Sequence, residues 1–301
     1  MEHDLEALIN QANQIILGKD RQIRLAVCCL LAKGHLLIED LPGVGKTTLS
    51  HALAKLFGMD YQRLQFTSYL LPADIIGSSV FMANEHAFKF HPGPIFRQMI
   101  LADEINRASP KAQSALLEAM EERQITVDGE TYALPELFFV IATQNPNHHV
   151  GTFSLPESQL DRFLMRIELG YPDHRAELSL LSGEARYRLL EDLPVMMPAE
   201  RLLQLQDQVA RVYASPALLN YVLAVVTFTR QSDQYHCGLS PRAGLALLNA
   251  AKAWALLANR DAVLPEDVQA VLPAVAGHRI RSGVGNSEAI VAPILQNVPA
   301  V

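Results

Sequence analysis

The chain has 301 residues, half of them hydrophobic, and three cysteines, so we expect a globular protein of about two domains without a disulfide framework or a Cys-x-x-Cys zinc site. Its 25 Lys and Arg against 32 Asp and Glu give a formal net charge of −7, which argues against a nucleic-acid partner bound through a basic surface. No apolar run approaches the roughly 20 residues of a membrane span and the N-terminus lacks a signal-peptide pattern, so we expect a cytoplasmic protein with no membrane segment.

Predicted helices and strands alternate in the first part of the chain. Amphipathic patterns predict helices at 5–17 and 20–33, each followed by a glycine, and another from Thr47 to residue 57. Ser109 as N-cap and Pro110 in the first turn predict a further helix. Short apolar runs between turn signals predict strands at 35–39, 62–66, 98–102, 137–142 and 164–169. This alternation favours a parallel α/β sheet.

Two hairpins are predicted within this α/β part. Asp128 and Gly129 lie between alternating residues at about 123–134, which is a strong two-residue hairpin signal. The segment at about 67–94 contains two short runs, 79–82 and 88–90, that predict a second hairpin.

The pattern changes at the turn formed by residues 170–173. Strand signals nearly vanish beyond it, and helical patterns cover about 174–190, 199–212, 215–230, 241–259 and 265–272. We therefore predict an α/β domain over residues 1–170 and an all-helical domain over 171–301. The tail from residue 282 has no pattern that predicts its structure.

A glycine-rich loop joins the first predicted strand to a helix, with the sequence DLPGVGKTT at 40–48. It matches the phosphate-binding pattern G-x-x-x-x-G-K-[ST] except at its first position, which is Asp40. Gly43 and Gly45 allow backbone N–H groups to point at phosphates, Lys46 can reach the β- and γ-phosphates, and the Thr47 hydroxyl can bind Mg²⁺. The predicted nucleotide-binding residues of the loop are Pro42, Gly43, Val44, Gly45, Lys46, Thr47 and Thr48.

Two adjacent carboxylates, Asp103 and Glu104, end the strand predicted at 98–102. In nucleoside triphosphatases an acid at the first position holds Mg²⁺ and one at the second polarises the attacking water. A small-molecule kinase does not need the second carboxylate here, so Glu104 favours ATP hydrolysis.

Three stretches together resemble the MoxR family of AAA+ ATPases, in the branch that carries a helix-2 insert. They are LPGVGKT at 41–47, ADEINRASPKAQSALLEAMEE at 102–122, and ATQNP at 142–146 followed by LPESQLDRF at 155–163. The resemblance extends over nearly the whole chain. It implies an α/β fold, with a P-loop AAA+ parallel-sheet core sandwiched by helices and followed by an all-α lid domain.

The resemblance also implies roles for single residues. Asn145 matches sensor 1, which positions the water. Arg162 matches the arginine finger that enters a neighbouring subunit's site; a local salt bridge is the alternative role, and Arg166 is the second candidate finger. Arg242 matches sensor 2, acting in its own site or in a neighbour's. Leu17 and Gly18 match the segment that lines the adenine, although a plain helix end explains them equally well.

For the protein as a whole, the resemblance implies Mg²⁺-dependent ATP hydrolysis by a homo-oligomeric ring of six subunits. Such a ring would remodel or mature a client protein together with a von Willebrand factor A-domain partner. The segment at 67–94 matches the helix-2 insert and the hairpin at 123–134 the pre-sensor-1 insert, and both would contact either the client or a neighbouring subunit. Two alternatives are an ATP-gated assembly scaffold with little turnover and a DNA-acting motor, which the acidic balance disfavours.

Overall fold

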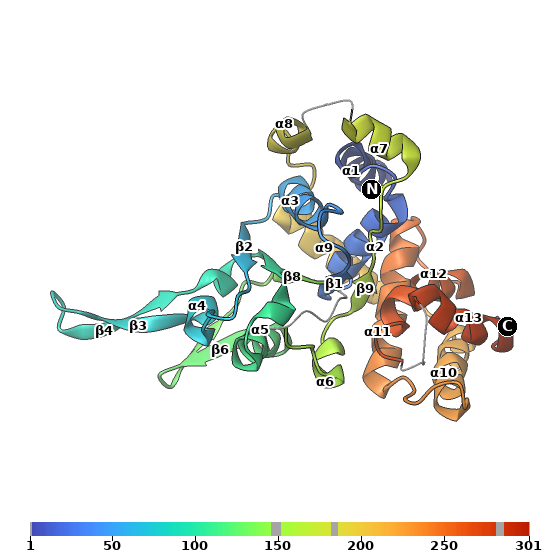
Figure 1. The fold of residues 1–301 in the computed structure, drawn as a ribbon. Coiled ribbons are helices and arrows are strands. Elements are labelled where there is room, and N and C mark those ends of the chain that lie inside the picture. Colours follow the sequence, from blue (N-terminus) through green and yellow to red (C-terminus); the bar gives the residue numbers. More distant parts are fainter. Residues whose placement is uncertain (1, 146–151, 182–185, 281–285, 301) are drawn as a thin grey trace.

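A five-stranded parallel sheet forms the centre of the α/β part (Figure 1). The computed structural model describes residues 2–145, 152–181, 186–280 and 286–300. The strand order is β2-β5-β8-β1-β9, and all four strand pairs are parallel. The strands are β1 (Leu36–Glu39), β2 (Tyr61–Gln65), β5 (Met99–Asp103), β8 (Phe139–Gln144) and β9 (Met165–Ile167). The predicted sheet is confirmed.

Helices cover both faces of this sheet. One face packs against α1 (Glu2–Ile15), α2 (Asp20–Leu31) and α3 (Lys46–Leu56), and the other against α5 (Pro110–Glu122). Along β8, Phe139 and Ile141 belong to the first core, whereas Val140 and Ala142 belong to the second. Because alternate residues of a strand point to opposite faces, a strand buried on both sides is apolar throughout. The short elements in this part are α4 (Pro72–Ile76), α6 (Glu157–Leu160) and two 3₁₀ turns, Pro94–Phe96 and Ile105–Arg107.

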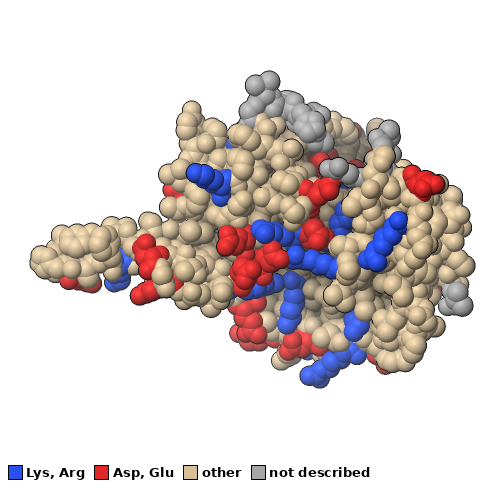
Figure 2. Space-filling view, turned by 90° about the horizontal axis from the view of Figure 1, so that it is seen from below, with Lys and Arg blue, Asp and Glu red and all other residues tan. Residues whose placement is uncertain are grey.

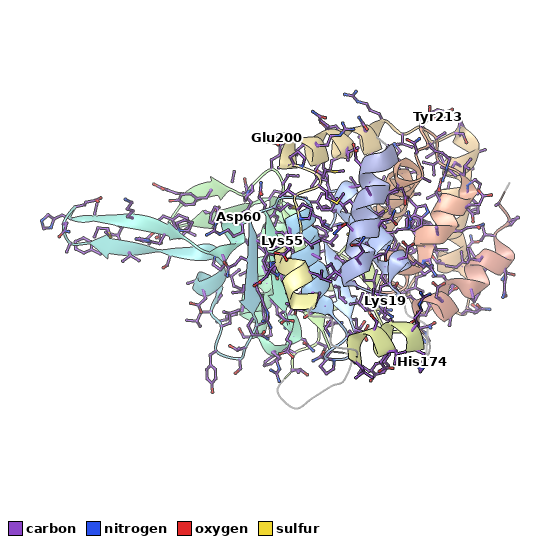
Figure 3. The ribbon with its side chains drawn as sticks, turned by 90° about the horizontal axis from the view of Figure 1, so that it is seen from above. Lys19, Lys55, Asp60, His174, Glu200 and Tyr213 are labelled. Atoms are coloured by element: carbon purple, nitrogen blue, oxygen red, sulfur yellow. The ribbon has the colours of Figure 1, made fainter. Side chains whose placement is uncertain are left out.

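After β9 the described chain contains helices joined by loops, with one isolated β-bridge and no strand. The helices are α7 (His174–Leu181), α8 (Arg186–Glu191), α9 (Ala199–Arg211), α10 (Pro216–Gln231), α11 (Pro241–Leu257), α12 (Pro265–Ala276) and α13 (Ser287–Asn297). α9 and α11 pack against α2, and α12 packs against β9. Lys55 of α3 donates a hydrogen bond to the Glu191 carbonyl at the end of α8 (Figure 3). The α1–α3 core continues without interruption into these helices.

Two details differ from the sequence expectations. The single helix expected at 174–190 is present as α7 and α8, with residues 182–185 outside the description. The tail contains α13, which no sequence pattern predicted. Its N-terminus is capped by the Asn286 side chain, which accepts the Ala289 N–H, and it buries Ile290, Val291 and Ile294. This helix buries only three residues and contains a proline, Pro293. The helical periodicity of its apolar positions is therefore too weak to detect in the sequence.

Both predicted hairpins are present. β3 (Gly77–Met82) pairs with β4 (Ala87–Pro92) in an arm that projects from the body in Figure 1, and β6 (Gln124–Val127) pairs with β7 (Glu130–Ala133) beside it. The Phe90 and Tyr132 rings stack with centroids 4.2 Å apart and so join the two hairpins. In the described part of the chain, we find no helix with the length and apolar character that crossing a bilayer requires.

His35 is a buried polar residue just before β1 that ties the sheet to α5. Its Nδ1 accepts the Val140 N–H at 3.0 Å, and its Nε2 lies 3.4 Å from the Met120 carbonyl oxygen. Burial, aided by the charge of Arg123, lowers the pKa of His35 to about 3. The folded protein therefore holds this imidazole neutral under conditions in which an unfolded chain would protonate it.

The stability of the fold should consequently fall in mild acid. Between about pH 6.5, where an unfolded histidine titrates, and about pH 3, the unfolded state binds a proton that His35 in the folded state does not. The free energy of unfolding should drop as pH falls through this window, by about 1.4 kcal/mol per pH unit for this one group. Urea unfolding from pH 7.5 to pH 5 measures it. His35→Gln should show a shallower decline, and an unchanged slope would contradict the assignment.

Candidate active site

The glycine-rich loop lies between the end of β1 and the start of α3. Gly43 and Gly45 have φ of +85° and +99°, where glycine is favoured, and a Cβ on either would meet no atom within 4 Å. Backbone conformation, and not lack of space, therefore requires glycine. No side chain caps α3 at Gly45, so its first N–H groups are available to an anion at the loop.

Asp40 explains why the loop departs from the strict pattern at its first position. One carboxylate oxygen accepts the Leu41 N–H and the other accepts the Gly170 N–H. The side chain is nearly buried and joins the loop to the segment that leads into α7. A glycine here could not make this connection.

Lys46, the first residue of α3, is buried and bonded to its own loop. Its Nζ donates to the carbonyl oxygens of Asp40 and Leu41 and to Asn145 Oδ1, the last at 3.1 Å. Burial lowers the pKa of Lys46, while nearby Asp40, Asp103 and Glu104 oppose that shift. Asn145 Nδ2 donates in turn to Glu104 Oε1 at 3.3 Å. The predicted sensor 1 thus lies between the lysine and the second acid.

Thr143, a fully buried residue of β8, fixes the acidic pair. Its hydroxyl donates to Asp103 Oδ1 at 2.7 Å and accepts the backbone N–H of Glu104 at 2.9 Å. Glu104 has a left-handed backbone with φ of 56°, which is uncommon for a residue other than glycine and typical of functional sites. One hydroxyl therefore sets both the Asp103 carboxylate and the unusual backbone of Glu104.

Three side chains that the sequence analysis did not single out as partners also hold the acids. Arg63 on β2 pairs with Asp103 Oδ2 at 2.6 Å, Gln65 Nε2 donates to Glu104 Oε2 at 3.1 Å, and Arg107 pairs with the same oxygen at 2.9 Å. Arg63 and Gln65 are near because β2 pairs with β5 in a register that sets Gln65 opposite Asp103. The alternation of Arg63 and Gln65 on an edge strand is the only sequence signal that could have indicated them.

These groups surround one cavity at the carboxyl ends of β1, β5 and β8, the edge where parallel sheets bind ligands. It has a volume of about 320 Å³. Its lining consists of Pro42, Gly43, Gly45, Lys46, Thr47, Thr48, Asp103, Glu104 and Asn145. The structure therefore brings together most of the predicted nucleotide-binding and catalytic residues.

The remaining predicted residues lie outside this lining. Gly18 has φ of +68°, and a Cβ there would lie 3.1 Å from Asp173 Oδ2. The next residue, Lys19, donates to the Tyr171 carbonyl at 2.7 Å, close to the start of α7 (Figure 3). Leu17 and Gly18 are thus next to the segment that Asp40 joins to the loop, and their contact with adenine stays a prediction.

The three candidate arginines also lie away from the cavity. Arg162 and Arg242 both pair with Glu121 at the end of α5, at 2.9 and 2.8 Å. Arg166 is held by Glu39 at 2.8 Å and by the Ser287 hydroxyl at 2.9 Å, with its side chain 17% exposed. The structure thus gives each of the three arginines a local ion pair, and which of them reaches a neighbour's site stays a prediction.

Comparison with known proteins agrees with this geometry. Residues 35–165 match the model of the ATPase family associated with various cellular activities (AAA), and residues 227–294 match an AAA lid domain. The chain is 46% identical to an uncharacterised protein, YeaC, of Bacillus subtilis, with 93% of this chain and 88% of that protein covered. It is 40% identical to the chaperone MoxR1 of Mycobacterium tuberculosis, with 92% and 76% covered. The chain belongs to the MoxR family of AAA ATPases.

A solved structure shares the fold as well. A protein of Cytophaga hutchinsonii that is classed as an ATPase superposes with a TM-score of 0.90 at 34% identity, over 100% of this chain and 96% of that one. The P-loop AAA+ core and the helical lid are therefore confirmed. As a MoxR-family ATPase, the chain binds nucleotide and hydrolyses ATP.

Removal of the Thr143 hydroxyl should lower the rate of that reaction. Thr143→Val keeps the shape but leaves the Glu104 N–H and one Asp103 oxygen without their partner, at a cost of about 1–3 kcal/mol. We expect ATP turnover to fall about tenfold to a hundredfold as Glu104 shifts. Steady-state phosphate release measures it. Thr143→Ser, which keeps the hydroxyl, is the control, and normal turnover in the valine variant would contradict this role.

Proposed function

We propose that the chain is a Mg²⁺-dependent ATPase whose subunits form a ring of six, in which each site is completed by arginines of a neighbour. The cavity at the ends of β1, β5 and β8 supports this proposal. It combines the phosphate loop, two acids and a polar sensor, which is the set of groups that nucleoside triphosphate hydrolysis uses.

Within one subunit, each group would have a distinct task. The loop N–H groups and Lys46 would bind the phosphates, and the Thr47 hydroxyl and Asp103 would hold Mg²⁺, which offsets phosphate charge when bound. Hard oxygen ligands of this kind suit that ion. Glu104 would take a proton from the attacking water, and Asn145 would orient that water.

We propose a second subunit because Lys46 is the only Lys or Arg in the described lining of the cavity, and its task is to bind the phosphates. Among the described residues, its lining includes no arginine, and the two arginines at its edge, Arg63 and Arg107, each pair with one of the acids. Arg162 and Arg242 instead share a surface carboxylate on α5. We propose that both act on a neighbour's nucleotide, since an arginine supplied in trans can stabilise the transferring phosphoryl group.

The position of the lid supports this arrangement for Arg242. The helix that begins next to it, α11, packs against α2, and α12 packs against β9 at the sheet edge opposite β2. The N-terminus of α11 meets the end of α5 through the ion pair between Arg242 and Glu121. This contact lies on the side of the molecule where α5, α6 and α10 are drawn in Figure 1. Figure 2 views the molecule from that side and shows acidic and basic side chains meeting near the middle of the face.

The proposed output is remodelling or maturation of a client protein in the cytoplasm. One relative is named a chaperone, which supports this class of function. The projecting β3–β4 hairpin carries exposed Phe81 and Phe88, whose rings pack edge to face and could contact a client. A von Willebrand factor A-domain partner is proposed from the family resemblance. The acidic balance of the chain favours a protein client over DNA.

Turnover should depend on assembly. Wild-type ATPase activity per subunit should rise with protein concentration, and Lys46→Ala and Arg162→Ala should each lose about 1000-fold. In a random 1:1 mixture of the two variants, half the sites keep Lys46 and half of those receive an intact Arg162, so about a quarter of the sites recover. Phosphate release against concentration measures this. Flat specific activity with an active Arg162→Ala protein would refute the shared site.

A separate variant distinguishes an ATPase from an ATP-gated scaffold. Glu104→Gln keeps a polar side chain of the same size but cannot accept the proton, so turnover should fall more than about a hundredfold. ATP affinity, measured by calorimetry, should stay near that of the wild type. Client remodelling that continues at the wild-type level in this variant would favour the scaffold.

A further inference from the structure

We infer that Glu121 is a positioning residue that holds Arg162 and Arg242 together as one unit for presentation to the neighbouring subunit's ATP. This inference deepens the proposed function and rests on it. Glu121 does not line the ATP-binding cavity, and the family resemblance assigns it no role, although it lies in the stretch 102–122 that carries that resemblance.

Glu121 binds the two arginines with separate oxygens. Arg162 Nε lies 2.9 Å from Oε2, and an Arg242 terminal nitrogen lies 2.8 Å from Oε1. The three residues come from three elements: the last turn of α5, the turn after α6, and the first turn of α11. One carboxylate therefore joins the AAA core, the candidate finger segment and the lid.

The carboxylate is needed because its two partners repel each other. Two guanidinium groups that pair with the same carboxylate lie close together, and both stay charged at any physiological pH. Arg279 also lies near Arg242: burial lowers the pKa of Arg279 most, its partner Asp161 raises it, and the charge of Arg242 lowers it further. Without Glu121, repulsion would drive the Arg162 and Arg242 guanidinium groups apart. The two groups would then no longer reach the neighbour's phosphates together.

The backbone that carries Arg162 is fixed independently. The nearly buried Arg279 side chain, from the turn after α12, donates to the Asp161 carboxylate at 2.6 Å and to the carbonyl oxygens of Phe163 and Leu164. These bonds lie on both sides of Arg162. The segment is thus held in place, while the direction of the Arg162 side chain, which is 25% exposed, is set by Glu121.

Glu121 is also suited to release its partners when phosphate arrives. Its own side chain is 33% exposed and that of Arg242 is 52% exposed, so these ion pairs are partly screened by water. A nucleotide phosphate carries several negative charges and can bind a guanidinium through two parallel hydrogen bonds, so it attracts an arginine more strongly than Glu121 does. Glu121 therefore holds the pair in place without trapping it.

The test uses Glu121→Gln in the full-length chain, with Glu122→Gln, the exposed next residue of α5, as the matched control. We expect Glu121→Gln to lower ATP turnover about tenfold to a hundredfold, as misplacement of a reacting group does, with ATP affinity unchanged. Glu122→Gln should hydrolyse ATP at the wild-type rate.

Mixing experiments then show which half of the shared site is damaged. Glu121→Gln mixed with Lys46→Ala should regain activity, because Lys46→Ala subunits present intact arginines to intact loops. Glu121→Gln mixed with Arg162→Ala should stay low, because neither variant presents the arginine pair. If Glu121→Gln merely damaged the fold, its ATP turnover would respond in the same way to both partners. Recovery with Lys46→Ala but not with Arg162→Ala therefore indicates that the arginines are misplaced.

Three outcomes overturn the inference. Wild-type turnover in Glu121→Gln would show that the arginines need no carboxylate between them. In a second outcome, Arg162→Ala recovers activity when mixed with Lys46→Ala, but Glu121→Gln does not. This would exclude the positioning role of Glu121 and leave the proposed function intact. If Arg162→Ala itself fails to recover with Lys46→Ala, the shared site is refuted and the role of Glu121 falls with it.

Discussion

The active-site geometry depends on the alignment of β1, β5 and β8 at one edge of the sheet. The N–H of Asp40 donates to the Gln144 carbonyl, and the Thr143 hydroxyl bridges Asp103 and the Glu104 backbone. These bonds set the phosphate loop and the acids relative to each other before any ligand binds. A shift of one residue in the β5–β8 pairing would turn Thr143 away from both acids. The apolar cores on the two faces keep that register in place.

The sequence predicted those parts of the site that are local in the chain. The loop at 40–48 and the Asp103–Glu104 pair are contiguous, and each follows an apolar strand that can be recognised by itself. Thr143, Arg63 and Gln65 could not be found in this way, because their roles depend on which strands are neighbours. The order β2-β5-β8-β1-β9 is not the order of the chain, and strand adjacency has no short-range signal.

The same limit applies to the lid. The α10, α11 and α12 ranges could be predicted from their periodic apolar positions, and their docking against α2 and β9 could not. The continuous core beneath them has a physical consequence. Buried side chains of the lid helices pack against those of α2 in one core, so a large movement of the lid would expose apolar surface to water. Small rotations about this interface are therefore favoured over full separation.

The stacked pair of Phe90 and Tyr132 connects the projecting hairpin to the interior. Tyr132 lies on β7, which pairs with β6, and β6 continues directly from α5 after a single residue, Arg123. Arg123 in turn donates to the carbonyl oxygens of Lys33 and Phe138, at the base of the sheet. The stacked rings, the second hairpin and Arg123 thus connect the projecting hairpin to the last turn of α5, which carries Glu121. A displacement of the outer hairpin would therefore be felt first at the carboxylate that binds Arg162 and Arg242, and only through that turn at the rest of the core.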